Sequence, residues 1–175
     1  MMVTLDGYYA GPNDEIDWHV VGDELHEYVI AMLNSLDTLM FGRVTYQGMA
    51  SYWPTPTAIK NDPIVAAKMN DLSKIVFSKT LDKVEWQNTR LVKEISPADI
   101  SKMKQQPGKD MAISGSLVST FAQHGLIDDY RILVNPLALG SGKPLFQGIK
   151  DRLHLKLLST KTFKTGLVLL QYRPV

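Results

Sequence analysis

Three short segments combine small or hydroxylated residues with cations in a way that suits phosphate binding. Gly42-Arg43-Val44-Thr45 follows the apolar run LMF, Ser78-Lys79-Thr80 follows IVF, and Ser114-Gly115-Ser116-Leu117 follows MAI. A glycine lets a ligand approach the backbone closely, a hydroxyl group donates a hydrogen bond, and an arginine can donate two parallel hydrogen bonds to one phosphate. Together the three segments predict an anion-binding rim.

Each segment, taken alone, is also typical of an ordinary capped helix start. A single Arg43 or Lys79 is most often a solvated surface residue. Matching chemistry at three strand-to-helix junctions favours the ligand-binding interpretation. The carboxyl ends of parallel strands meet at one edge of a sheet, and the helices that follow present free N–H groups there.

Other site chemistries lack the residues that they need. The chain has no cysteine, which excludes disulfides, thiolate nucleophiles and Cys-ligated metals. Its histidines, at positions 19, 26, 124 and 154, lack the spacing of a two-histidine helical site, so we expect no metal. The GSGKP segment at 140–144 does not have the spacing of a P-loop, and neither Ser114 nor Ser116 lies in a Gly-x-Ser-x-Gly hydrolase turn.

Helix and strand patterns alternate along most of the chain and would position the three segments. Apolar residues recur at three- and four-residue spacing over 23–36, which predicts a helix. Residues 37–42 are typical of a buried strand, and a short helix is expected from about 44 to 52. Asp62-Pro63 and Ser96-Pro97 are both helix-start signals, an N-cap residue followed by proline.

The rest of the chain continues this alternation and then changes character. Further elements are expected at 74–78, 90–93 and 111–115 (strands), 116–125 (a helix) and 129–136 (a strand). The last segments, 152–163 and 166–174, are typical of an antiparallel hairpin. The order predicts an α/β fold, a mixed, mainly parallel sheet with helices on both faces. With no repeat or linker, we expect one domain over residues 1–175.

Composition narrows the classes of partner. The formal net charge is +1, with 19 basic and 18 acidic residues interspersed. The chain therefore lacks the strong positive field that would attract nucleic acid or anionic lipid. No apolar run approaches the roughly 20 residues of a membrane span, and the N-terminus lacks a signal-peptide pattern. We therefore expect a soluble, unprocessed cytoplasmic protein that binds a small molecule.

Five blocks of the sequence resemble a known family. They are LDGYYAGPNDEIDW, LMFGRVTYQGM, KIVFSKTL, MAISGSLV and LIDDYRILVNPLALGSGKPLF. In this order they are similar to the dihydrofolate-reductase-like group that includes the C-terminal reductase domain of riboflavin biosynthesis. The resemblance covers almost the whole chain and implies a three-layer dihydrofolate-reductase-like fold, NADPH as cofactor and a homodimer formed through the C-terminal strands.

The resemblance also implies roles for the three segments. The adenosine 2′-phosphate would lie near two of the turns. The first contributes Arg43 and Thr45, with Gly42, and the second contributes Ser78 and Lys79. The turn of Ser114, Gly115 and Ser116, with Leu117, is similar to the one that packs against the pyrophosphate. Arg43 and Lys79 would then favour NADPH over NADH, because the 2′-phosphate adds charge for them to meet.

The resemblance also implies which residues lie near the substrate, although several of them have an alternative interpretation. Asp6 matches the aspartate of the reductases' LDG motif and would lie where substrate meets the nicotinamide, although Asp-Gly after a strand is also a common turn. Trp18 takes the place of the tryptophan in the loop that covers the nicotinamide. For the substrate carboxylate, Glu24, His26 and Glu27 all fall near the expected place, with Glu27 taken as the substrate contact. Lys143 could contact an anionic substrate or cap a surface turn.

Two classes of function follow. The first is an NADPH-dependent reductase similar to 5-amino-6-(5-phosphoribosylamino)uracil reductase, acting on a small heterocyclic or ribosylamino substrate, with dihydrofolate reduction as an alternative. The second is a nucleotide-binding module without turnover.

Because few residues precede Asp6, the first strand would be unusually short, and we also expect residues upstream or an alternative start.

Overall fold

The computed structural model describes residues 1–175 as two compact units. Unit 1 comprises Met1–His26 and Val118–Val175, and unit 2 comprises Glu27–Leu117. Helix α1 (Asp23–Asn34) and helix α6 (Leu117–Gln123) each contribute residues to both units.

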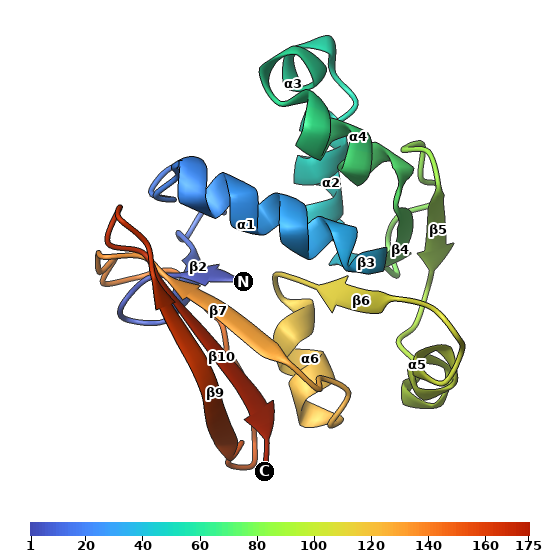
Figure 1. The fold of residues 1–175 in the computed structure, drawn as a ribbon. Helices are drawn as coiled ribbons and strands as arrows, with labels where there is room; N and C mark the ends of the chain where they lie inside the picture. The colour runs from blue at the N-terminus through green and yellow to red at the C-terminus, as the bar shows by residue number, and fades with distance from the viewer. The chain divides into compact units, whose positions relative to one another are not determined.

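Unit 2 is built on a parallel sheet of four strands in the order β5-β4-β3-β6 (Figure 1). The strands are β3 (Leu36–Gly42), β4 (Ser73–Phe77), β5 (Thr89–Val92) and β6 (Asp110–Ile113). Its other helices are α2 (Arg43–Tyr52), α3 (Pro56–Asn61), α4 (Pro63–Asp71) and α5 (Pro97–Lys104).

Strand order places the helices of unit 2 on both faces of this sheet. The chain steps from β3 to β4 in one direction and from β5 back across to β6 in the other. Because crossovers between parallel strands are right-handed, the helices of the two connections lie on opposite faces. Figure 1 shows α2 and α4 on one side and α5 on the other.

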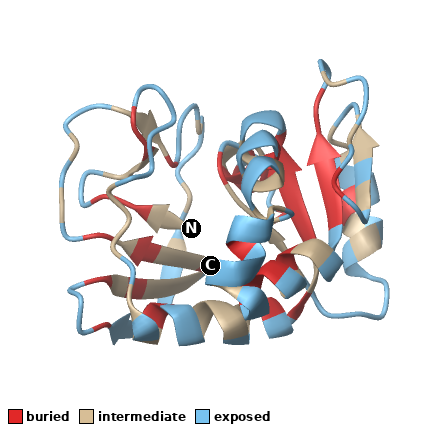
Figure 2. Ribbon diagram, turned by 90° about the horizontal axis from the view of Figure 1, so that it is seen from above, coloured by how far each residue is buried: buried red, intermediate tan, exposed pale blue.

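The core of unit 2 lies where α1, α2 and α4 cover the sheet. Figure 2 shows its central strands as largely buried, in keeping with the apolar runs of β3 and β4. The core cluster consists of Leu33, Leu36, Leu39, Phe41, Tyr46, Val65, Met69, Val76 and Trp86. Continuous burial of this kind is what strands covered on both faces require.

Unit 1 contains a mixed sheet in the order β1-β7-β10-β9, in which β1 pairs in parallel with β7 and the other pairs are antiparallel. These strands are β1 (Met2–Val3), β7 (Tyr130–Val134), β9 (Leu155–Thr162) and β10 (Val168–Pro174). A second, small antiparallel sheet pairs β2 (Tyr8–Ala10) with β8 (Lys143–Pro144).

The mixed α/β fold with its C-terminal antiparallel hairpin is confirmed, with some differences in the elements. The helix expected over 23–36 ends at Asn34, because Leu36 already pairs with Asp110 in strand β3. Helix α3 and strands β2 and β8 were not expected. None of the helices has the length and apolar character that a membrane crossing requires.

Candidate functional site

The three predicted segments of unit 2 follow neighbouring strands of one parallel sheet. In the register, Gly42 of β3 lies opposite Phe77 of β4, and Met40 of β3 lies opposite Ile113 of β6. Segments 42–45, 78–80 and 114–117 therefore leave the sheet at the same edge. We call this edge, formed by the carboxyl ends of β3, β4 and β6, the strand-end rim.

Two turns of the rim approach each other closely. Gly115 has a φ of +68°, and a Cβ atom there would lie 2.5 Å from Oγ1 of Thr45. A Cβ atom on Gly42 would lie 3.3 Å from Oγ of Ser116. The close approach explains why a glycine stands at 115, since a side chain would force the two turns apart and is also disfavoured by the left-handed backbone.

Helix α2 presents an uncapped N-terminus at the rim. Its N-cap residue, Gly42, makes no side-chain cap hydrogen bond, and the first turn has no acidic residue. Free N–H groups and the positive end of the helix dipole favour an anion at such a terminus. Arg43 is exposed in this first turn, and its Nη1 donates a hydrogen bond to Oε1 of Gln47 at 3.1 Å, so its guanidinium stands at the solvent side of α2.

In the segment after β4, Ser78 and Lys79 have different environments. Ser78 is 8% exposed, and its hydroxyl oxygen accepts hydrogen bonds from the backbone N–H groups of Thr80 (3.2 Å) and Leu81 (3.1 Å). Ser78 thus holds the shape of its own turn. Lys79 is exposed, which leaves it as the cation of this turn that can meet a ligand.

Asp6, in unit 1, is engaged by three donors. Its carboxylate accepts hydrogen bonds from the Thr4 hydroxyl (2.5 Å) and from the backbone N–H groups of Gly140 (2.7 Å) and Leu139 (3.2 Å). These hydrogen bonds, that of Thr4 first, lower the pKa of Asp6. The carboxylate therefore stays ionised and ties the end of β1 to residues 139–140. It is better suited to fixing this loop than to accepting a proton.

The loop that carries Trp18 is internally hydrogen-bonded. The N–H of Gly11 donates to the carbonyl of Glu15 at 2.9 Å, and the indole N–H of Trp18 donates to the same carbonyl at 3.1 Å. The Trp18 ring meets the ring of His19 edge-on, with centroids 4.5 Å apart. Lys143 forms an ion pair with Asp14 of this loop. In this conformation Lys143 anchors the loop.

The three candidates for a substrate carboxylate contact differ in their environments. Glu24 accepts a hydrogen bond from the backbone N–H of Lys164 at 2.9 Å, which lowers the pKa of Glu24, and forms an ion pair with the ammonium of Lys164 at 3.5 Å. His26 and Glu27 are exposed. Glu24 is thus committed within unit 1, which leaves the exposed Glu27 as the carboxylate more open to a ligand.

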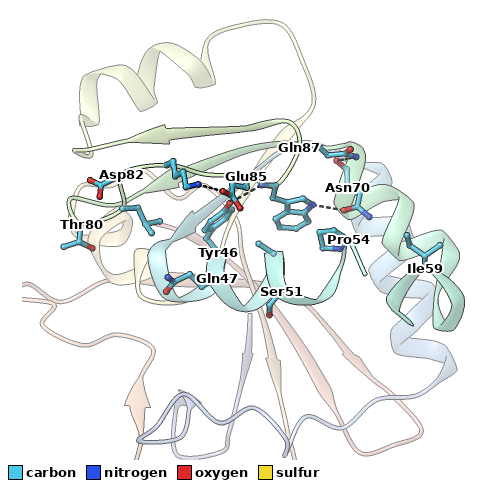
Figure 3. A pocket seen from close by; sticks show the side chains of 14 residues that line it. Tyr46, Gln47, Ser51, Pro54, Ile59, Asn70, Thr80, Asp82, Glu85 and Gln87 are labelled. Atoms are coloured by element: carbon cyan, nitrogen blue, oxygen red, sulfur yellow. Dashed lines mark hydrogen bonds and ion pairs between the residues drawn. The ribbon is translucent and has the colours of Figure 1, made fainter. Parts of the chain in front are cut away.

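Unit 2 also contains a cavity of about 990 Å³ that the sequence did not predict (Figure 3). Helix α2 and the loop after β4, residues 78–88, contribute most of its lining. Gln47 and Thr80 are among its lining residues. Gln47 lies one helical turn after Arg43, and Thr80 directly follows Lys79. Tyr46, Asn70 and Trp86 also line it, and Trp86 donates hydrogen bonds to both of the other two side chains, which joins the loop to α2 and α4.

The comparison with protein families decides the relationship. Residues 1–169 match the family described as the RibD C-terminal domain. The chain belongs to this family. Two uncharacterized Bacillus subtilis relatives, YyaP and YwjB, are 33% and 29% identical over 178 and 165 residues, covering 98% and 92% of this chain and 91% and 88% of theirs.

Solved structures share the fold of this RibD C-terminal domain. A putative riboflavin biosynthesis protein from Shewanella sp. PV-4 has a TM-score of 0.79 at 23% identity, covering 100% of this chain and 96% of that one. A Thermotoga maritima deaminase/5-amino-6-(5-phosphoribosylamino)uracil reductase has a TM-score of 0.67 at 16% identity, covering 99% of this chain and 55% of that one. Dihydrofolate reductase from Enterococcus faecalis, complexed with NADP(H), has a TM-score of 0.63 at 14% identity, covering 99% and 92%.

The family supports an oxidoreductase, and the rim of unit 2 fits the charge of a nicotinamide dinucleotide. The uncapped N-terminus of α2 and the exposed side chains of Arg43 and Lys79 supply one helix dipole and two cations at a single sheet edge. These donors suit a ligand with several phosphate charges. No group of three or more acidic or histidine side chains is placed to hold a metal ion.

Proposed function

We propose that this RibD C-terminal domain is an NADPH-dependent reductase that acts on a small heterocyclic or ribosylamino substrate, as 5-amino-6-(5-phosphoribosylamino)uracil reductase does. In this proposal the chain acts as one reductase domain. The observation that carries it is the strand-end rim, where three turns and two cations share one edge of a parallel sheet.

The residues of the chain would mainly bind the cofactor and the substrate and orient them relative to each other. The cofactor, when bound, supplies the hydride, so the protein needs to hold the reacting groups together and exclude water. Arg43 and Lys79 would meet the 2′-phosphate, Thr45 would donate its hydroxyl, and the turn around Gly115 would lie along the pyrophosphate. Trp18, Glu27 and Lys143 are proposed to contact substrate, and Asp6 to shape the substrate side through its loop.

Cofactor binding tests the rim directly. We expect the double variant Arg43→Ala/Lys79→Ala to bind NADPH about 100-fold more weakly, since each charge-assisted hydrogen bond is worth about 1.5 kcal/mol or more and about 1.4 kcal/mol is tenfold in affinity. NADH binding should change little. Lys60→Ala, which removes an exposed lysine from α3, is the matched control. Unchanged NADPH affinity in the double variant would refute the assignment.

A dinucleotide-binding module without turnover remains the second candidate. It is favoured by the state of Asp6, whose carboxylate is engaged by three donors and has a lowered pKa. Oxidation of NADPH measured with ribosylaminopyrimidine, dihydrofolate and other pteridine acceptors separates the candidates. Consumption with one acceptor supports the reductase, whereas tight binding without consumption for any of them supports the module.

We further propose a homodimer formed through the C-terminal strands. Strand β9 lies at the edge of the unit 1 sheet, pairing with β10. All of its residues after Leu155 are exposed, including Leu157 (48%) and Leu158 (44%). An edge strand with unpaired backbone groups and exposed leucines is a favourable surface for pairing with a second copy.

A further inference from the structure

The side chain of Tyr46 connects helix α2 to the loop formed by residues 78–88. Its hydroxyl oxygen accepts hydrogen bonds from the backbone N–H groups of Glu85 (3.1 Å) and Trp86 (3.3 Å) (Figure 3). The ring of Tyr46 is 6% exposed and belongs to the core cluster of unit 2. The ring thus packs as a phenylalanine would, and the hydroxyl serves the loop.

The loop end of this connection is itself rigidly held. Trp86 is 6% exposed, and its indole N–H donates to Oδ1 of Asn70 at 2.7 Å. The amide of Asn70 in turn donates to the carbonyl of Trp53 at 3.0 Å. The ammonium of Lys74 lies 4.5 Å from the centre of the Trp86 ring. Because these partners come from α4, β4 and the end of α2, the side chain of Trp86 has little freedom to move, while the backbone N–H groups of residues 85 and 86 depend on the Tyr46 hydroxyl as acceptor.

The connection reaches both cations of the rim. Arg43 lies three residues before Tyr46 on α2, and Lys79 lies near the start of the loop whose far end Tyr46 holds. Between them, the Ser78 hydroxyl fixes the turn that follows Lys79 by accepting from Thr80 and Leu81. Tyr46 therefore links the helix that carries Arg43 to the far end of the loop that begins beside Lys79.

We propose that Tyr46 is a positioning residue for cofactor selectivity: its hydroxyl holds loop 78–88 against α2 so that Arg43 and Lys79 meet one 2′-phosphate together. This inference rests on the proposed function. Without the hydroxyl, two backbone N–H groups lose their acceptor, and the loop must shift to hydrate them. Lys79 would then lose its alignment with Arg43, whereas contacts to the rest of the dinucleotide would remain.

The test compares Tyr46→Phe with Tyr52→Phe. Tyr52 lies on the same helix but is 44% exposed, so its variant removes the same atom without touching the loop. Dissociation constants for NADPH and NADH are measured for both variants and the wild type, and hydrogen exchange is followed at the amides of Glu85 and Trp86. For Tyr46→Phe we expect about tenfold weaker NADPH binding, an NADH affinity within about twofold, and faster exchange at both amides.

The outcomes separate this inference from the function on which it rests. A wild type that binds NADPH no better than NADH overturns the assignment of the rim, and the inference with it. A wild-type preference for NADPH that Tyr46→Phe retains in full overturns the inference alone. Equal weakening for both dinucleotides also overturns it, because that result is what a merely structural role of the hydroxyl would give.

Discussion

Replacing Lys74 with methionine should destabilise the protein, and the loss should grow as the pH rises. Lys74 is 1% exposed, in strand β4. Its ammonium donates hydrogen bonds to the carbonyls of Met69 (2.9 Å), Asn70 (3.0 Å) and Leu72 (2.7 Å). These carbonyls lie at the C-terminal end of α4 and just beyond it, where a helix leaves acceptors unpaired and favours a cation.

Burial makes this ammonium sensitive to pH. Desolvation lowers the pKa of Lys74 from 10.5 to about 8, with a smaller opposing effect of Asp71. Between these two values the unfolded chain binds more protons than the folded one, so the free energy of unfolding rises with pH. From about pH 7 to about pH 9.5 the gain from this one group is about 2 kcal/mol, an upper value because water that reaches the site would reduce the shift.

The methionine variant loses the three hydrogen bonds and this pH dependence together. At about pH 7 we expect it to be less stable than the wild type by about 2–4 kcal/mol, since buried carbonyls lose their donor while the methionine side chain recovers some apolar contact. By about pH 9.5 the gap should be wider by up to about 2 kcal/mol, because only the wild type gains stability from releasing the proton.

Denaturant unfolding at a series of pH values measures this gap. Other titrating groups are the same in both proteins, so the difference between them isolates Lys74. Lys60→Met, at an exposed position of α3, is the control and should give a small gap that does not vary with pH. A Lys74→Met gap that stays constant, or narrows as the pH rises, would refute the reasoning, because it would mean that the three carbonyls keep the folded lysine protonated.

Two further variants test the rim and the edge strand. Gly115→Ala should destabilise the protein by about 1–3 kcal/mol and weaken NADPH binding, because the added Cβ would lie 2.5 Å from Oγ1 of Thr45 and the backbone φ is +68°. Thermal melts and cofactor titrations measure the two effects. Gly48→Ala is the control, since no atom lies within 4 Å of its added Cβ. Leu158→Lys should convert a dimer to a monomer in light scattering while leaving NADPH affinity unchanged, and a wild type with the mass of one chain would contradict the proposed pairing.

Much of unit 2 could be predicted because its signals are local. Asp62 accepts a hydrogen bond from the N–H of Val65 at 3.0 Å, and Ser96 accepts one from Asp99 at 3.2 Å, as their cap-plus-proline patterns indicated. The apolar runs before Gly42 and before Ser78 are buried strands. Parallel pairing then brings their ends together, so the place of the rim followed from strand order without knowledge of any side-chain contact.

Other elements were missed for two different reasons. Helix α3 has the same start signal as its neighbours, since Thr55 accepts a hydrogen bond from the N–H of Ala58 at 3.2 Å and Pro56 follows it. The sequence therefore carries a signal for this helix. Strands β2 and β8, in contrast, are three and two residues long, and pair across more than 130 residues. Such short strands exist only through their partner and leave no periodic pattern.

The contacts that position the rim were invisible for a related reason, yet one of them left a trace. The hydrogen bonds of Tyr46 to residues 85 and 86 join positions 39 and 40 apart, so no local pattern reports them. Lys74, however, stands inside the apolar run KIVF, where a strand covered on both faces must bury it. A buried cation requires acceptors, and the C-terminal end of the helix immediately before the strand supplies them. A charged residue within a buried strand therefore predicts a polar anchor even where its partners cannot be named.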